Sequence, residues 1–144
     1  MKRLRNQKGA ALLETAITLP LVLLVCVSIF EFGRAYQTWQ VLTNAAREGA
    51  RIAVLSDATD TQVRTAVRAY MTSGRLPSGA VADANVAVER TVPFATTSTA
   101  SRVTVSYPFK FTVLNPVIRL VKSSATAGAG TTTMVSVALM RNES

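Results

Sequence analysis

The sequence has no histidine and only one cysteine, Cys26. A lone cysteine cannot form a disulfide within the chain, and without histidine the common nucleophile–base pairs and zinc-ligand sets are absent. The acidic residues Asp57, Asp60, Asp83 and Glu89 are isolated and typical of caps, loops and solvated strand faces, and no Gly-rich phosphate loop occurs. We therefore expect no enzymatic activity, no cofactor and no metal site.

The formal net charge of +8 is unevenly distributed along the chain. Four of the basic residues lie within the first nine positions, and the others are spread between positions 34 and 141. Nucleic-acid-binding proteins usually gather Lys and Arg on one face or element, so this distribution argues against a nucleic-acid partner. A basic cluster that ends where an apolar run begins is instead typical of a membrane topology signal.

Residues 10–30 form that apolar run, AALLETAITLPLVLLVCVSIF, with the single charged residue Glu14. As an α-helix the run would be about 30 Å long, which matches the hydrocarbon core of a bilayer. A cleaved secretory peptide would be shorter and would end in a small-residue site, and a domain of this size could hardly enclose such a helix. We expect a single transmembrane helix in contact with the lipid bilayer.

The basic residues also predict the orientation of this helix. Four precede the run, whereas only Arg34 lies in the sixteen residues after it. The N-terminus should therefore stay in the cytoplasm, and residues 31–144 should form a domain outside it.

Glu14 lies one turn inside the apolar run, where it either serves a function or reaches the cytoplasmic headgroups. If the chain were cut after Gly9, Ala10 would carry the N-terminal amine, which has a pKa of about 8. Such a cation needs an anionic partner in an apolar environment. Residues 10 and 14 are one helical turn apart, so Glu14 of the same or a neighbouring subunit could reach the amine.

A basic leader, Gly9, four apolar residues, Glu14 and an unbroken apolar helix together resemble a type IV prepilin signal. In that family a membrane-bound prepilin peptidase cuts after the Gly, and the Glu pairs with a subunit's N-terminal amine during filament entry. The resemblance implies a leader of residues 1–9, cleavage between Gly9 and Ala10, and a role for Glu14 in assembly.

The helical pattern continues from residue 31 to about residue 55. Apolar residues at steps of three and four mark one stripe: Phe32, Tyr36, Trp39, Leu42, Ala46, Ala50 and Ala53. The aromatic residues could lie at the outer membrane interface or pack against other elements, and the pattern leaves both roles open. The small residues Ala46, Gly49, Ala50 and Ala53 favour close packing within the domain, with a subunit interface as the alternative.

Phe32-Gly33-Arg34 and the stretch NAAREGAR at 44–51, together with Leu19-Pro20, are similar to the signature of TadE-like proteins. The resemblance is close over residues 9–55 and extends beyond them only in layout. It implies a pseudopilin or minor pilin of the tight-adherence (Flp/Tad) pilus system. Pro20 should also kink or loosen the helix, because it removes one helical hydrogen bond.

The resemblance further implies a place in the bacterial inner membrane, with the C-terminal domain in the periplasm or outside the cell in a pilus. Its implied partners are the prepilin peptidase, other pilins and pseudopilins, and the pilus assembly platform. Major pilins of this type are much shorter, so we expect a minor subunit, with the TadE-like and TadF-like roles left open. A static single-pass binding or scaffold module that never enters a filament is the alternative.

The remaining sequence predicts a second helix at 60–73 and strands at about 85–92, 101–113 and 131–140. We expect a loop at 77–79, and Pro108 predicts that the middle strand is bent or lies at an edge. Asn115-Pro116 predicts a break, then a brief helix to Val121 and a small-residue loop at 123–130. A long helix packed on a small antiparallel sheet would bury the apolar faces of both, so we expect a pilin-like α+β fold.

Overall fold

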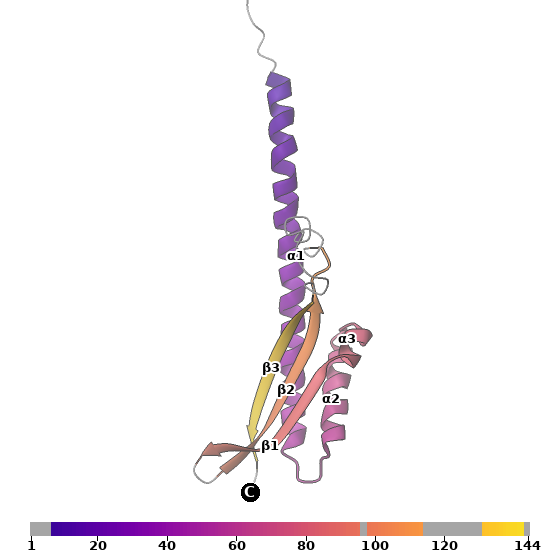
Figure 1. Ribbon diagram of the computed structural model, residues 1–144, viewed down its shortest axis with the longest axis vertical. Coiled ribbons are helices and arrows are strands. Elements are labelled where there is room, and N and C mark those ends of the chain that lie inside the picture. Colours follow the sequence, from indigo (N-terminus) through magenta and orange to yellow (C-terminus); the bar gives the residue numbers. More distant parts are fainter. Residues whose placement is uncertain (1–6, 96–97, 114–130, 143–144) are drawn as a thin grey trace, which may run out of the picture.

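The computed structural model describes residues 7–95, 98–113 and 131–142. The break, brief helix and loop predicted between residues 115 and 130 lie outside the described residues. The elements are α1 (Gln7–Ala53), α2 (Asp60–Ser73), α3 (Ser78–Ala82), β1 (Asn85–Ala95), β2 (Ser98–Lys110) and β3 (Thr131–Arg141). Figure 1 shows the C-terminal half of α1 lying along the sheet, with its N-terminal half projecting away from the domain.

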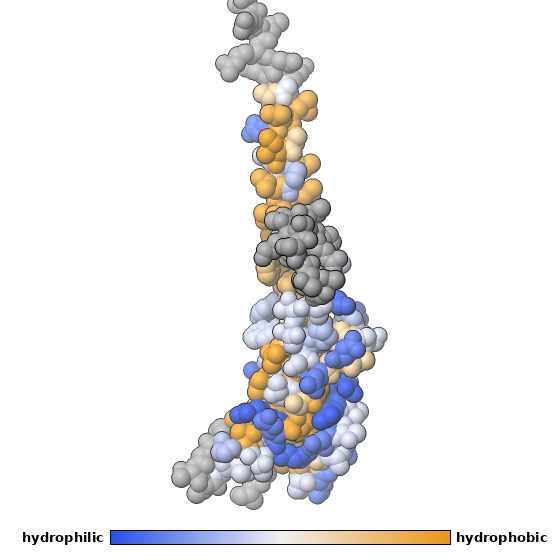
Figure 2. Space-filling view, viewed as in Figure 1, coloured by the Kyte–Doolittle hydropathy of each residue, from blue (hydrophilic) through white to orange (hydrophobic). Residues whose placement is uncertain are grey.

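The projecting half of α1 is apolar on its surface (Figure 2). It is the one helix in the described part of the chain that is long and apolar enough to cross a membrane. The hydroxyls of Thr15, Thr18 and Ser28 donate to carbonyl oxygens four residues earlier, so these polar groups are satisfied within the helix itself. This arrangement is compatible with a single-pass membrane anchor.

The sheet is antiparallel, with strand order β1-β2-β3. Val103 at the middle of β2 pairs with Val88 of β1 and Ala138 of β3. Val103, Val105 and alternating residues beyond them are buried against α1 and α2. The structure thus confirms the α+β fold, in which a long N-terminal helix packs on a small antiparallel sheet.

Of the two alternatives predicted from Pro108, a bent strand or an edge strand, the edge strand is not found, because β2 is the central strand of the sheet. The pairing of β1 with β2 reaches only to Asn85 and Ser106. Pro108 lies beyond this point and pairs only with Thr133 of β3. One side of β2 therefore has no neighbouring strand there, and the missing N–H of proline is tolerated.

The helix α2 begins with a capping box, in which Thr59 and Gln62 each bond the other's backbone N–H. Its residues Val63, Val67 and Met71 are buried, whereas Tyr70 is exposed. The loop predicted at 77–79 is only partly correct, because the short helix α3 begins at Ser78 and buries Val81.

Candidate functional site

The structure places Gly9, Ala10, Glu14 and Pro20 on the projecting half of α1, and all four are exposed. The helix begins at Gln7, so it already includes the Gly9–Ala10 junction. Ala10 and Glu14 lie one turn apart on the same side of the helix. The helix continues through Pro20 without a break. None of these residues belongs to the core of the domain, so their side chains remain accessible to lipid or to other subunits.

The small-residue face is packed inside the domain. Ala46, Ala50 and Ala53 are buried with Gly49 in the core. A Cβ atom added at Gly49 would lie 2.5 Å from Val67 Cγ2 on α2 and 3.2 Å from a methyl group of β2. The narrow helix surface therefore lets α2 and the sheet approach α1 closely, and this face is covered by the protein's own domain.

The first half of the predicted apolar stripe is not buried. Phe32, Tyr36 and Trp39 are exposed. On the N-terminal side of Leu42, other residues of α1 face the domain, again at steps of three and four. These are the fully buried Glu31, the partly buried Ala35 and the buried Thr38. The sequence pattern missed this face because two of its three members are polar.

Glu31 has no exposed surface and is held by four hydrogen-bond contacts. Its carboxylate accepts from the backbone N–H of Thr112 at 3.0 and 3.2 Å and from the N–H of Val113 at 3.0 Å. Arg34 donates from Nη2 to the same carboxylate at 2.9 Å. We call this group of residues, Glu31, Arg34, Thr112 and Val113, the Glu31 clamp.

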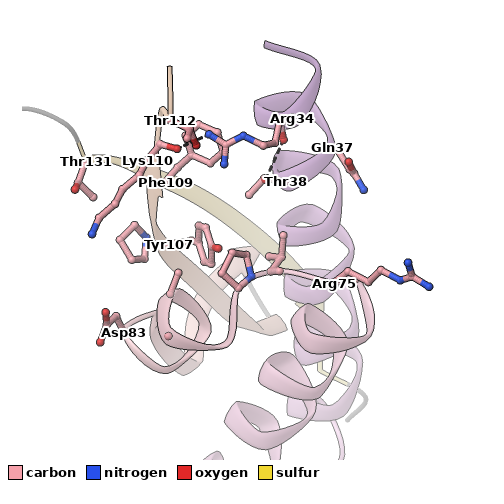
Figure 3. A pocket seen from close by; sticks show the side chains of 16 residues that line it. Arg34, Gln37, Thr38, Arg75, Asp83, Tyr107, Phe109, Lys110, Thr112 and Thr131 are labelled. Carbon is pink, nitrogen blue, oxygen red and sulfur yellow. Dashed lines mark hydrogen bonds between the residues drawn. The ribbon is translucent and has the colours of Figure 1, made fainter. Parts of the chain in front are cut away.

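Arg34 extends the clamp to the end of β2. Its guanidinium lies 4.6 Å from the centre of the Phe109 ring and also donates to the carbonyl oxygen of Lys110 (Figure 3). The hydroxyl of Thr38 donates to the Arg34 carbonyl oxygen one turn further along α1. The clamp thus joins the first turn of α1 after residue 30 to the end of the sheet that lies nearest the projecting half of α1.

The clamp also explains where β2 ends. The predicted strand reached residue 113, but β2 ends at Lys110. The N–H groups of Thr112 and Val113 donate to Glu31 instead of to a neighbouring strand. A carboxylate on the helix therefore replaces the sheet as their hydrogen-bond partner.

The electrostatics of the clamp favour an ionised carboxylate. Burial by itself raises the pKa of Glu31. The hydrogen bond and charge of Arg34, together with the two backbone N–H groups, lower that pKa by more than burial raises it. The pKa of Glu31 therefore lies below its ordinary value. The paired charges of Glu31 and Arg34 cancel, so the clamp is ionic inside but carries no net charge.

A second polar group holds the opposite end of the domain. Arg90 donates to Asp60 at 2.9 Å and to the Ala53 carbonyl oxygen at 3.0 Å. The Ser101 hydroxyl also donates to Ala53, at 3.3 Å, and to the side chain of Asn142. These bonds satisfy the Ala53 carbonyl oxygen at the C-terminal end of α1 and attach that end to the sheet. The role of this group is therefore to stabilise the fold. Among the described residues no cluster of side chains could hold a metal ion.

The N-terminal region can now be compared with known proteins. The family model described as TadE-like protein matches residues 9–51. This segment of the chain is TadE-like. The match confirms the resemblance seen in the sequence and includes the membrane-spanning candidate, Glu31 and Arg34, and the small-residue positions up to Ala50. The match supports involvement of the chain in the Tad pilus system, with components of that system as its partners. No curated protein and no solved structure matches the chain.

Proposed function

We propose that the protein is a minor pilin or pseudopilin that takes part in assembling a tight-adherence pilus and that it is not an enzyme. The observation that supports this most is the projecting half of α1, in which Gly9, Ala10 and Glu14 are exposed within the TadE-like segment. Among the described residues, the buried apolar core lies in residues 42–109, and the residues packed against it begin at Ala35. Residues 10–30 are thus free to span the inner membrane, with the N-terminus in the cytoplasm and the domain in the periplasm.

The first test of this proposal is processing by a prepilin peptidase. We expect cleavage between Gly9 and Ala10, which leaves a mature chain from Ala10 to Ser144. Intact mass and N-terminal sequencing of protein recovered from cells with the peptidase will show the new terminus. A bulky side chain in Gly9→Leu should block cleavage, because the protease must bring the backbone at this position close to its catalytic groups. A chain that still starts at Met1 in those cells would contradict the proposal.

The second test concerns assembly. Glu14→Ala should leave cleavage and the folded domain intact but lower incorporation into pili by about tenfold or more, since each 1.4 kcal/mol lost from its pairing with an N-terminal amine is a factor of ten. Glu14→Asp keeps the charge on a shorter side chain and should be intermediate. Thr15→Ala is the matched control, because the neighbouring Thr15 is also exposed and its hydroxyl donates only to its own helix. Pilus counts by electron microscopy measure the effect.

Normal pilus numbers in the Glu14→Ala variant, together with an uncleaved chain, would favour the static membrane-anchored module instead. Normal numbers with a cleaved chain would reject only the pairing role of Glu14.

A further inference from the structure

The Glu31 clamp fixes the height of the sheet above the membrane. Val113 donates its N–H to Glu31, the first residue after the apolar run of residues 10–30. The helix is continuous from that run into the domain, so residue 31 cannot move far from the end of the span. The end of the β2 segment therefore lies level with the membrane boundary, beside α1.

The surface at this level is apolar. Val113 is 42% exposed and Phe32 is 62% exposed. The Phe32 ring packs edge-on against the Phe111 ring, with 6.4 Å between the ring centroids. The rings of Phe111 and Phe109 pack in the same manner, with 5.1 Å between their centroids. One apolar surface thus runs from the helix to the end of the sheet, and its exposed part contributes no burial free energy as long as it faces water.

We propose that Phe32, Phe111 and Val113 contact the bilayer surface as a second membrane contact, at the boundary between lipid headgroups and acyl chains. Phe and aliphatic side chains partition into this boundary when a polar face stays in water. The neutral clamp fits such a place, because the charges of its carboxylate and guanidinium cancel each other and the backbone N–H groups of Thr112 and Val113 have hydrogen-bond partners. The domain would then rest against the membrane surface and not stand clear of it.

Exposure alone does not indicate a membrane contact, because Val137 is exposed at a distance from the projecting helix; the argument for the membrane is the position of Val113 and Phe32 beside the end of the apolar run. Val137 on β3 is 55% exposed and pairs with Thr104 of β2. Thr104 is six residues before Lys110, so Val137 lies about 20 Å further along the sheet from the membrane end, at about 3.3 Å per residue. Val137 is therefore a control of the same residue type that is somewhat more exposed than Val113 but distant from the membrane end of the sheet.

This inference rests on the membrane anchor of the proposed function but not on cleavage or pilus assembly. The experiment uses the full chain in phosphatidylglycerol-containing vesicles, without peptidase or pilus components. Val113→Cys and Val137→Cys are each made in a Cys26→Ser background, labelled with an environment-sensitive fluorophore, and checked for folding by circular dichroism. The native chain labelled at Cys26, its only cysteine, reports whether the span inserts.

We expect lipids that carry a nitroxide near the headgroup to quench the label at position 113 severalfold more than the label at position 137. Equal, weak quenching of both, with the Cys26 label quenched by deep nitroxides, would show an inserted span whose domain stands off the membrane, and would overturn the inference alone. An unquenched Cys26 label would overturn the anchor and with it the inference. Equal, strong quenching at both positions would also overturn it, because the whole domain would then adsorb nonspecifically.

Discussion

Glu31→Gln should lower the thermal midpoint of the domain by about 10 °C or more, corresponding to a loss of about 2–4 kcal/mol. The neutral amide leaves Arg34 without its counter-ion and turns a donor group toward the guanidinium. Because the side chain at position 31 is fully buried, water cannot replace the lost interactions. Breaking a fully buried pair usually costs about 3–5 kcal/mol. We expect less because the Arg34 side chain is 34% exposed and keeps part of its hydration.

Glu48→Gln is the matched control for this prediction. Glu48 and Arg51 have the same i,i+3 spacing on the same helix, and their charged atoms are 2.7 Å apart, but both side chains reach solvent. Its thermal midpoint should change little. The measurement is unfolding of the full chain in detergent by circular dichroism, with amide hydrogen exchange at Thr112 and Val113. Equal midpoints for the Glu31 and Glu48 variants would show that the clamp contributes no special stability.

The clamp also predicts a dependence of stability on pH. Folding lowers the pKa of Glu31, so its ionised form adds stability that is fully present above the unfolded-state pKa of about 4.3. That stability is lost as the pH falls through the lower pKa of the folded state. The Glu31→Gln variant should therefore lose less stability than the native chain on acidification below about pH 4.3.

The helices and the fold class followed from local patterns in the sequence. The apolar run and the stripe beyond it predicted one long helix, and α1 ends at Ala53, two residues before the predicted end. The second helix has the predicted bounds, because a capping box and Gly74 fix its two ends through contacts between near neighbours. Alternation of apolar residues predicted the strands, since burial on one face is a local property.

What the sequence did not predict depends on contacts between distant residues. Glu31 is 81 positions from Thr112, and no local pattern shows that a charged residue will be buried by bonds to the end of a strand. For the same reason the apolar stripe left the role of Phe32 open, whereas the structure shows its ring exposed and packed against Phe111. The central position of the strand that holds Pro108 was not predicted either, because proline is tolerated there only where β1 no longer pairs with β2, and strand pairing decides that point.

Gly49→Ala should destabilise the domain by about 1–2 kcal/mol and lower its thermal midpoint by about 4–8 °C. Alanine alone would favour the helix by about 1 kcal/mol over glycine. The added methyl group would, however, lie 2.5 Å from Val67 Cγ2, and valine cannot rotate away easily because its branched side chain is confined at χ1. The overpacking cost of about 1–3 kcal/mol should therefore exceed the propensity gain.

Gly33→Ala is the control for this prediction, because it is the same substitution in the same helix without a close contact like that of Gly49 with Val67. The two variants should change the thermal midpoint in opposite directions. A Cβ atom at Gly33 meets nothing within 4 Å, so only the propensity gain of about 0.5–1 kcal/mol remains. Its thermal midpoint should rise by a few degrees while that of Gly49→Ala falls, both measured on the full chain in detergent. If both variants were stabilised, α2 would have to lie further from α1 than the contact at Gly49 requires, and the close packing of the small-residue face would be wrong.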